Sequence, residues 1–131
     1  MATFTHFREL DVWNDARELC KVIFDASNRM PFARDFALKD QIRRSSGSVM
    51  DNIAEGFERG GNAEFIHFLS IAKGSAGEVQ SQLYRALDRN YISQEDFDSL
   101  CNHAERISAS IMKLMNYLRN CEIKGIKFKK Y

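Results

Sequence analysis

Glu64 and His67 have the spacing of two ligands of a metal centre. A glutamate followed three residues later by a histidine helps to hold the di-iron pair of ferritin-like helical bundles. Such a site needs a second Glu-x-x-His pair and two more glutamates. Here Leu100 stands three residues before His103, and His6 precedes the first helical pattern. We therefore expect no metal and interpret His67 as a surface residue.

Serine chemistry is the second possibility, because Ser45, Ser46 and Ser48 lie close to Glu55 in the sequence. A nucleophilic serine needs a histidine, an acid and a turn that exposes its hydroxyl group, and this set is missing here. The glycines of residues 56–61 do not form a phosphate-binding loop, which requires a lysine followed by serine or threonine after a strand. We expect no catalytic residues and no cofactor.

Basic side chains are the candidates for binding a nucleic acid. The chain carries 19 Lys and Arg against 18 Asp and Glu, a net charge of +1, whereas nucleic-acid-binding domains usually have a strongly basic face. The excess lies in the tail, residues 122–131, where four lysines accompany Glu122. The candidate RNA contacts are Arg8, Arg43, Arg44, Arg59, Lys124, Lys127, Lys129 and Lys130. Arginines on helices are often solvated or paired with nearby carboxylates, which is the competing interpretation for the first four.

Two aromatic residues stand among the tail lysines, Phe128 and Tyr131. Aromatic rings beside basic side chains can stack on exposed bases. The same rings can equally anchor the tail on an apolar surface of the protein. The sequence leaves both interpretations open.

The elements that position these residues are all predicted to be helices. Apolar residues recur every three or four positions in four segments, about 10–30, 35–59, 62–88 and 93–120. Pro31, the only proline, and the pair Gly60 and Gly61 separate the first three segments. Long helices joined by short links favour an all-α, antiparallel up-down-up-down four-helix bundle. We expect one domain, residues 1–121, followed by the basic tail.

Segment 35–59 carries two kinds of residue on separate lines. Ile42, Val49 and Ile53 share one face of the predicted helix and form its core side. Polar residues follow one edge of that face, where they can hydrogen-bond to each other or to a neighbouring helix. We call these residues the polar seam: Gln41, Ser48, Asn52 and Glu55.

Segment 62–88 has small residues where charged, solvent-facing groups are expected. Each glycine inside a helix costs about 1 kcal/mol relative to alanine, so a close backbone neighbour is expected against this line. Helices with more packable surface than one core uses predict a homo-oligomer. We call Ser70, Gly74, Gly77 and Ser81 the small-residue stripe, and Gly47 of segment 35–59 is a further expected packing residue.

Composition and the N-terminal sequence predict the compartment. Apolar residues make up 44% of the chain, and no apolar run approaches the roughly 18 residues needed to cross a bilayer. The first ten residues lack the basic and apolar blocks of a signal peptide. We expect a cytoplasmic protein without a membrane partner.

Three stretches, Phe7–Trp13, Gln41–Gly56 and Phe65–Glu78, together resemble the bacterial four-helix-bundle family of the 23S rRNA intervening-sequence protein. The most specific element is Ser48-x-x-x-Asn52-Ile-Ala-Glu-Gly. The resemblance implies a homopentamer without catalytic residues, encoded in some bacteria inside an insertion in the large ribosomal RNA gene. The fold is also similar to that of the basic, pentameric accessory proteins of diversity-generating retroelements, from which this chain departs by its near-neutral charge.

The leading hypothesis from the sequence is a non-enzymatic, homo-oligomeric bundle associated with structured RNA, with ribosomal RNA as the first candidate. The alternative is a protein-interaction scaffold that holds a partner protein and makes no RNA contact. The charge arrangement on the folded surface would discriminate between them, because a continuous positive surface favours RNA and a mixed surface favours a protein.

Overall fold

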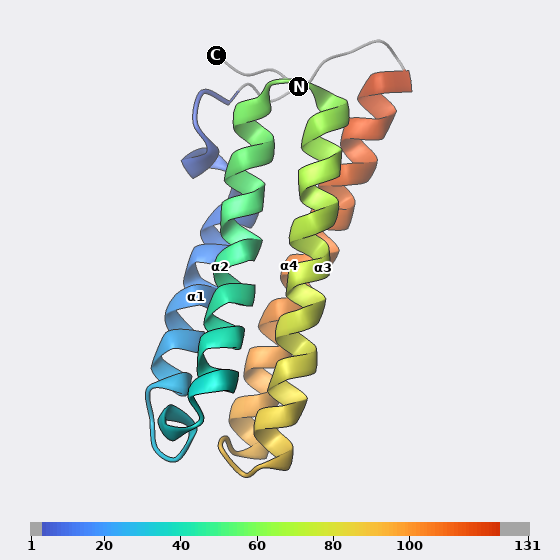
Figure 1. Ribbon diagram of the computed structural model, residues 1–131. Coiled ribbons are helices and arrows are strands. Elements are labelled where there is room, and N and C mark those ends of the chain that lie inside the picture. Colours follow the sequence, from blue (N-terminus) through green and yellow to red (C-terminus); the bar gives the residue numbers. More distant parts are fainter. Residues whose placement is uncertain (1–3, 124–131) are drawn as a thin grey trace.

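Four antiparallel helices form the bundle in the computed structural model, which describes residues 4–123 (Figure 1). The helices are α1 (Asp11–Ser27), α2 (Phe36–Arg59), α3 (Asn62–Asp88) and α4 (Gln94–Ile123), with 3-10 turns η1 (Phe7–Glu9) and η2 (Phe32–Arg34). This part of the chain contains no β-strand. α2 packs against α1 and α3, and α4 packs against α3 and α1. The predicted fold class, an all-α up-down-up-down bundle, is confirmed.

The core runs between the helices along the whole bundle. Ile42, Val49 and Ile53 are fully buried, which confirms the predicted core side of α2. Leu19 of α1 and Ile111 of α4 are buried in the same apolar cluster. Burial of a large aliphatic side chain contributes about 1.5–3 kcal/mol, so this continuous apolar face is the main reason why the helices associate.

Local sequence signals explain where the helices begin and end. The Asp35 side chain caps α2 by accepting a hydrogen bond from the Leu38 backbone N–H at 3.2 Å. The Ser93 hydroxyl group accepts one from the Asp96 N–H at 3.0 Å and caps α4 in the same way. Gly60 ends α2 with a φ of 85°, in the left-handed region that glycine tolerates best.

α1 ends at Ser27, a few residues before the expected limit near Met30. Pro31 disfavours the helical backbone conformation at Met30, the residue before it, so the helix ends before this pair. The Asn28 backbone N–H still donates to the Phe24 carbonyl group at 3.0 Å and closes the last turn of α1.

The topology places particular segments at each end of the bundle. η1, the end of α2, the start of α3 and the end of α4 lie together at the upper end in Figure 1, and the α1–α2 and α3–α4 connections lie at the other. Within residues 4–123, none of the helices has the length and apolar character to cross a membrane.

Candidate subunit and RNA interface

The polar seam lies where α2 faces α3. The hydroxyl oxygens of Ser48 and Ser75 are 2.9 Å apart, joining α2 to α3. Asn52 Nδ2 donates to the Ser48 carbonyl group at 2.8 Å and to Ser48 Oγ at 2.9 Å. Because Ser48 Oγ accepts from Asn52, its own hydrogen is available for Ser75. The middle of the seam is therefore a hydrogen-bonded contact between two helices of one chain.

The two outer members of the seam have partners of their own. Gln41 Oε1 accepts a hydrogen bond from Arg85 Nη1 of α3 at 2.9 Å. Glu55 pairs with Arg59 one turn later, with 3.1 Å between Oε2 and Nε. The seam thus continues from the lower half of α2 to its upper end, but its charged contacts lie on the exposed side of the helices.

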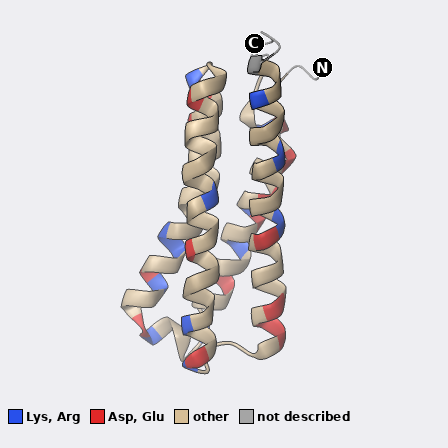
Figure 2. Ribbon diagram, turned by 90° about the vertical axis from the view of Figure 1, so that its right-hand side faces the viewer, with Lys and Arg blue, Asp and Glu red and all other residues tan. Residues whose placement is uncertain are grey.

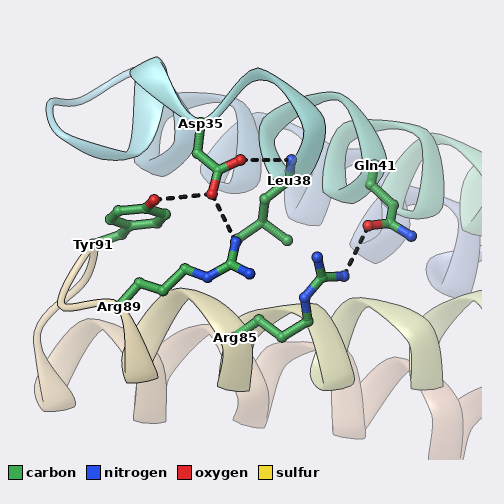
Figure 3. A network of polar contacts seen from close by, with 6 residues as sticks. All are labelled: Asp35, Leu38, Gln41, Arg85, Arg89 and Tyr91. Atoms are coloured by element: carbon green, nitrogen blue, oxygen red, sulfur yellow. Dashed lines mark hydrogen bonds and ion pairs between the residues drawn. The ribbon is translucent and has the colours of Figure 1, made fainter.

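A second polar network fixes the lower end of α2 to the α3–α4 connection (Figure 3). Asp35 Oδ2 accepts from Arg89 Nη1 at 2.7 Å and from the Tyr91 hydroxyl group at 2.9 Å, while Oδ1 accepts from the Leu38 N–H. The Leu38 and Tyr91 hydrogen bonds and the Arg89 charge hold the pKa of Asp35 below its ordinary value. The bond to Asp35 also raises the pKa of Tyr91.

The sequence did not predict this network of Asp35, Arg89 and Tyr91. The helix start near Asp35 was a detectable signal, because aspartate is a favoured N-cap residue. Arg85, Arg89 and Tyr91 carried no such signal, since their contacts depend on how α3 is aligned with α2.

A groove of about 610 Å³ lies on the outer side of α2 and α3. Ala37, Ser45 and Ser48 of α2 line it with small side chains. Its charges are mixed: Arg44 stands with Asp40 and Glu78, and Gln41 completes the lining. A groove with small walls and both signs of charge suits a polypeptide better than a phosphate backbone, which would require a net positive lining.

The small-residue stripe is open to its surroundings in the single chain. Gly74 and Gly77 are exposed, and no atom outside the local backbone lies within 4 Å of a Cβ built at either position or at Gly47. Ser70 and Ser81 are exposed as well, and the Ser70 hydroxyl group donates to the His67 carbonyl group. The close neighbour expected against this stripe is therefore not another part of residues 4–123.

Gly56 is the glycine that permits close approach inside the chain. A Cβ at this position would lie 2.8 Å from Phe68 Cβ, 3.0 Å from Phe65 Cδ1 and 3.3 Å from the Phe65 carbonyl oxygen. Real Cβ atoms essentially never lie closer than 3.0 Å to another atom, so the absence of a side chain allows α2 and α3 to meet near their shared connection.

The four candidate arginines lie in different environments. Arg43 is half-buried, with its guanidinium carbon 4.1 Å from the centre of the Phe24 ring and its Nε donating to Ser27 Oγ at 2.8 Å. Arg59 is exposed but pairs with Glu55 and lies 5.0 Å above the Phe68 ring.

Arg44 and Arg8 are exposed, and neither side chain has a hydrogen-bond or ion-pair partner within residues 4–123. Arg8 precedes α1 and Arg59 ends α2, so both belong to the upper end, where α4 also ends. Lys124, Lys127, Lys129 and Lys130 lie outside the described residues.

The charged groups are mixed over the visible faces of the helices. Figure 2 shows, along the ribbon, Lys and Arg positions interspersed with Asp and Glu positions. Along α4, Glu95, Asp96 and Asp98 stand near the start and Lys113 and Arg119 near the end. Glu95 and Asp96 lie in the first turn, where negative charge complements the helix dipole, whereas the last turn carries no basic residue.

The residues considered for metal binding or serine catalysis do not form a common site among the described residues. His67 is exposed beside Phe68, and Glu64 lies 3.8 Å from Arg59. The described part of the chain contains no group of three or more His, Cys, Asp or Glu side chains that could hold a metal ion. Ser45 Oγ and Ser46 Oγ donate to carbonyl groups of their own helix, those of Gln41 and Arg43.

Comparisons with known proteins give one family. The family model described as 23S rRNA-intervening sequence protein matches residues 8–113. A crystal structure from Bacteroides thetaiotaomicron, described as a protein of unknown function from the S23 ribosomal protein family, is similar with a TM-score of 0.73 and 25% sequence identity. The similarity covers 79% of this chain and 97% of that one. A comparison with curated proteins finds no match. Neither description names an enzymatic activity.

Proposed function

The chain belongs to the 23S rRNA-intervening sequence protein family, and from this membership we propose that it is a non-enzymatic, homo-oligomeric bundle that associates with structured RNA. The observation that carries the proposal is the family match over residues 8–113, because it links this chain to proteins named for ribosomal RNA. The distribution of basic residues supports the proposal and indicates which of them make the contact.

The tail is the main RNA-binding segment in this proposal. Without its four lysines, the chain has 15 basic residues against 18 acidic ones, so the remaining sequence repels a phosphate backbone on average. The Arg43 guanidinium group already contacts Phe24 and Ser27, and Glu55 neutralises Arg59. The tail lysines bind the phosphates, with Arg8 as a further contact at the same end of the bundle.

Assembly makes a weak contact effective. We place the subunit interface on the small-residue stripe and the groove between α2 and α3, where small walls let a neighbouring helix approach closely. Joining this face to a different face of the next subunit gives a closed ring, and the family resemblance implies five subunits. A ring presents one basic tail per subunit, so several weak phosphate contacts act together.

The proposal is tested by measuring the affinity of the assembled protein for 23S ribosomal RNA fragments across a salt series. The test variant replaces Lys124, Lys127, Lys129 and Lys130 with alanine. Each lost phosphate contact should reduce the slope of log affinity against log salt by about 0.7–0.9, so the wild-type slope should fall by roughly three if most lysines bind.

The matched control removes four other exposed basic residues by alanine substitution at Lys21, Arg34, Arg106 and Lys113. This control loses the same formal charge but keeps the tail, so it should retain most of the slope. An affinity that does not weaken with salt, or that is unchanged in the tail variant, would contradict the proposed contact.

A protein-interaction scaffold is the second candidate, and the mixture of basic and acidic residues along the helices favours it (Figure 2). In that function the oligomer surface holds a partner protein and makes no RNA contact. Copurification from cells, with and without nuclease treatment, discriminates between the two candidates. Partners that stay bound after RNA digestion indicate a scaffold, and partners lost after digestion indicate an RNA-bound assembly.

A further inference from the structure

A second groove, of about 330 Å³, lies between the start of α1 and the last turns of α4. Its apolar lining includes Phe4, Val12, Leu114 and Tyr117. Tyr117 remains 39% exposed, although its ring borders this apolar surface. The volume lies at the lower limit of typical ligand pockets, about 300–1,000 Å³, and is sufficient for apolar side chains of a short segment.

The groove has an acidic edge. Asp11 and Asp15 line it, and no lysine or arginine does so among the described residues. Neither carboxylate forms an ion pair within residues 4–123. The nearby His103 ring contacts the Asp15 backbone carbonyl group rather than its carboxylate. An occupant of this groove should therefore combine apolar side chains with positive charge.

The chain itself provides such a segment directly after α4. Eight residues, 124–131, follow Ile123, and they have the sequence KGIKFKKY. In an extended segment, successive side chains point to opposite sides, so Ile126 and Phe128 share one side while Lys127 and Lys129 share the other. Gly125 has the backbone freedom needed for the chain to reverse direction after a helix.

The length of this segment is sufficient to reach the groove. The groove borders α4 between Ser110 and Tyr117. At 1.5 Å per residue, these positions lie about 9–20 Å back along the helix from Ile123. Eight extended residues span up to about 26–29 Å. The groove and the end of α4 also lie in the same half of the bundle.

We propose that residues 124–131 fold back into the α1–α4 groove of their own subunit. Ile126 and Phe128 pack on the apolar lining, and Lys127 and Lys129 direct their ammonium groups to Asp11 and Asp15 at the edge. The long aliphatic stems of the lysines allow the charges to reach the carboxylates from the solvent side. This docking needs no RNA, and phosphates would compete with Asp11 and Asp15 for Lys127 and Lys129.

Photo-cross-linking of the full chain tests the proposal, with p-benzoylphenylalanine in place of Phe128 and no RNA present. We expect cross-links to Val12, Leu114 or Tyr117 on a chain that migrates as a monomer in a denaturing gel. Cross-links to the same groove of another copy, seen as a covalent dimer, would overturn docking within one subunit. Cross-links outside the groove, or none to protein, would overturn the groove as the binding site.

The acidic edge is tested in the same assay by Asp11→Asn combined with Asp15→Asn. Two weak surface ion pairs predict a reduction of docking by about fivefold. The matched control, Glu18→Gln with Asp25→Asn, removes two charges from α1 outside the groove and should keep the wild-type yield. Raising the salt concentration should also weaken docking of the wild-type tail, because salt screens ion pairs at the surface. This measurement needs no substitution. The proposed charge pairing would be contradicted if the cross-linking yield of the Asp11 and Asp15 variant equalled that of the control variant and if high salt left the wild-type yield unchanged.

Discussion

Arg43 shows how contacts with another helix determine the role of a side chain. Its position beside the apolar face of α2 left it as a candidate RNA contact, but its guanidinium group packs on Phe24 of α1. The hydrogen bond to Ser27 fixes the same group from a second direction. The amino-acid pattern of α2 contains neither partner, so the sequence could not distinguish a residue that joins two helices from one that faces a ligand.

Gly56 supports a prediction about the contact between α2 and α3. Gly56→Ala should lower the free energy of unfolding by up to about 2 kcal/mol, because overpacking costs about 1–3 kcal/mol and the gain in helix propensity, about 1 kcal/mol, offsets part of it. Urea unfolding of both proteins measures the difference. The control is Gly61→Ala, outside the small-residue stripe, where a Cβ meets nothing within 4 Å and φ is −108°. Equal losses in the two variants would contradict a specific clash with Phe65 and Phe68.

Asp35 supports a prediction about pH. Its pKa is lower in the fold than its ordinary value of 3.8, so the ionised form stabilises the folded protein above that value. This contribution should disappear as the pH falls through the lowered pKa. The Tm difference between wild type and Asp35→Asn should therefore stay constant above about pH 5 and shrink as the pH falls below 3.8 in thermal melts.

The comparison for that experiment is Asp40→Asn, an exposed position in the first turns of α2. The Asp40 carboxylate has no hydrogen-bond or ion-pair partner within residues 4–123. Its Tm difference from wild type should change little over the same pH range. A pH dependence as large as that of Asp35→Asn would show that the Arg89 and Tyr91 contacts are not the cause.

At the scale of the helices, the sequence predicted where the helices begin and end, because residues within one segment determine these limits. Asp35, Gly60 and Ser93 are signals within one segment, and the structure places a helix start or end at each of them. The alignment between helices is not local. Ser75 and Arg85 meet Ser48 and Gln41 only because α3 has a particular register against α2. Hydrophobic periodicity predicts which face is buried but leaves this register open.

The exposed stripe on α3 gives a prediction about assembly. Gly74→Leu or Gly77→Leu adds a large side chain where we propose that a neighbouring subunit packs, so either change should lower the oligomer mass measured by light scattering. Ala109→Leu, at an exposed position of α4, is the control and should leave the mass unchanged. Wild-type mass in both glycine variants would rule out this packing role.

At the scale of the whole molecule, composition predicted a near-neutral protein but not how its charges are arranged. The basic and acidic residues balance over most of the chain, and the lysines after α4 account for the positive excess. An even number of antiparallel helices returns the end of α4, which precedes these lysines in the sequence, to the end of the bundle where η1 begins. A charge total contains no information about this arrangement.

The shared location of η1 and the end of α4 has a consequence for a cyclic assembly. Rotation about one axis keeps every subunit pointing the same way, so a ring of these bundles has a front and a back. In a ring whose axis runs along the bundles, the front carries the η1 and α4 ends, and the back carries every α1–α2 and α3–α4 connection, including the Asp35 contacts. Cargo held by the chain ends would be gathered on the front alone, and the back would remain open for a different neighbour.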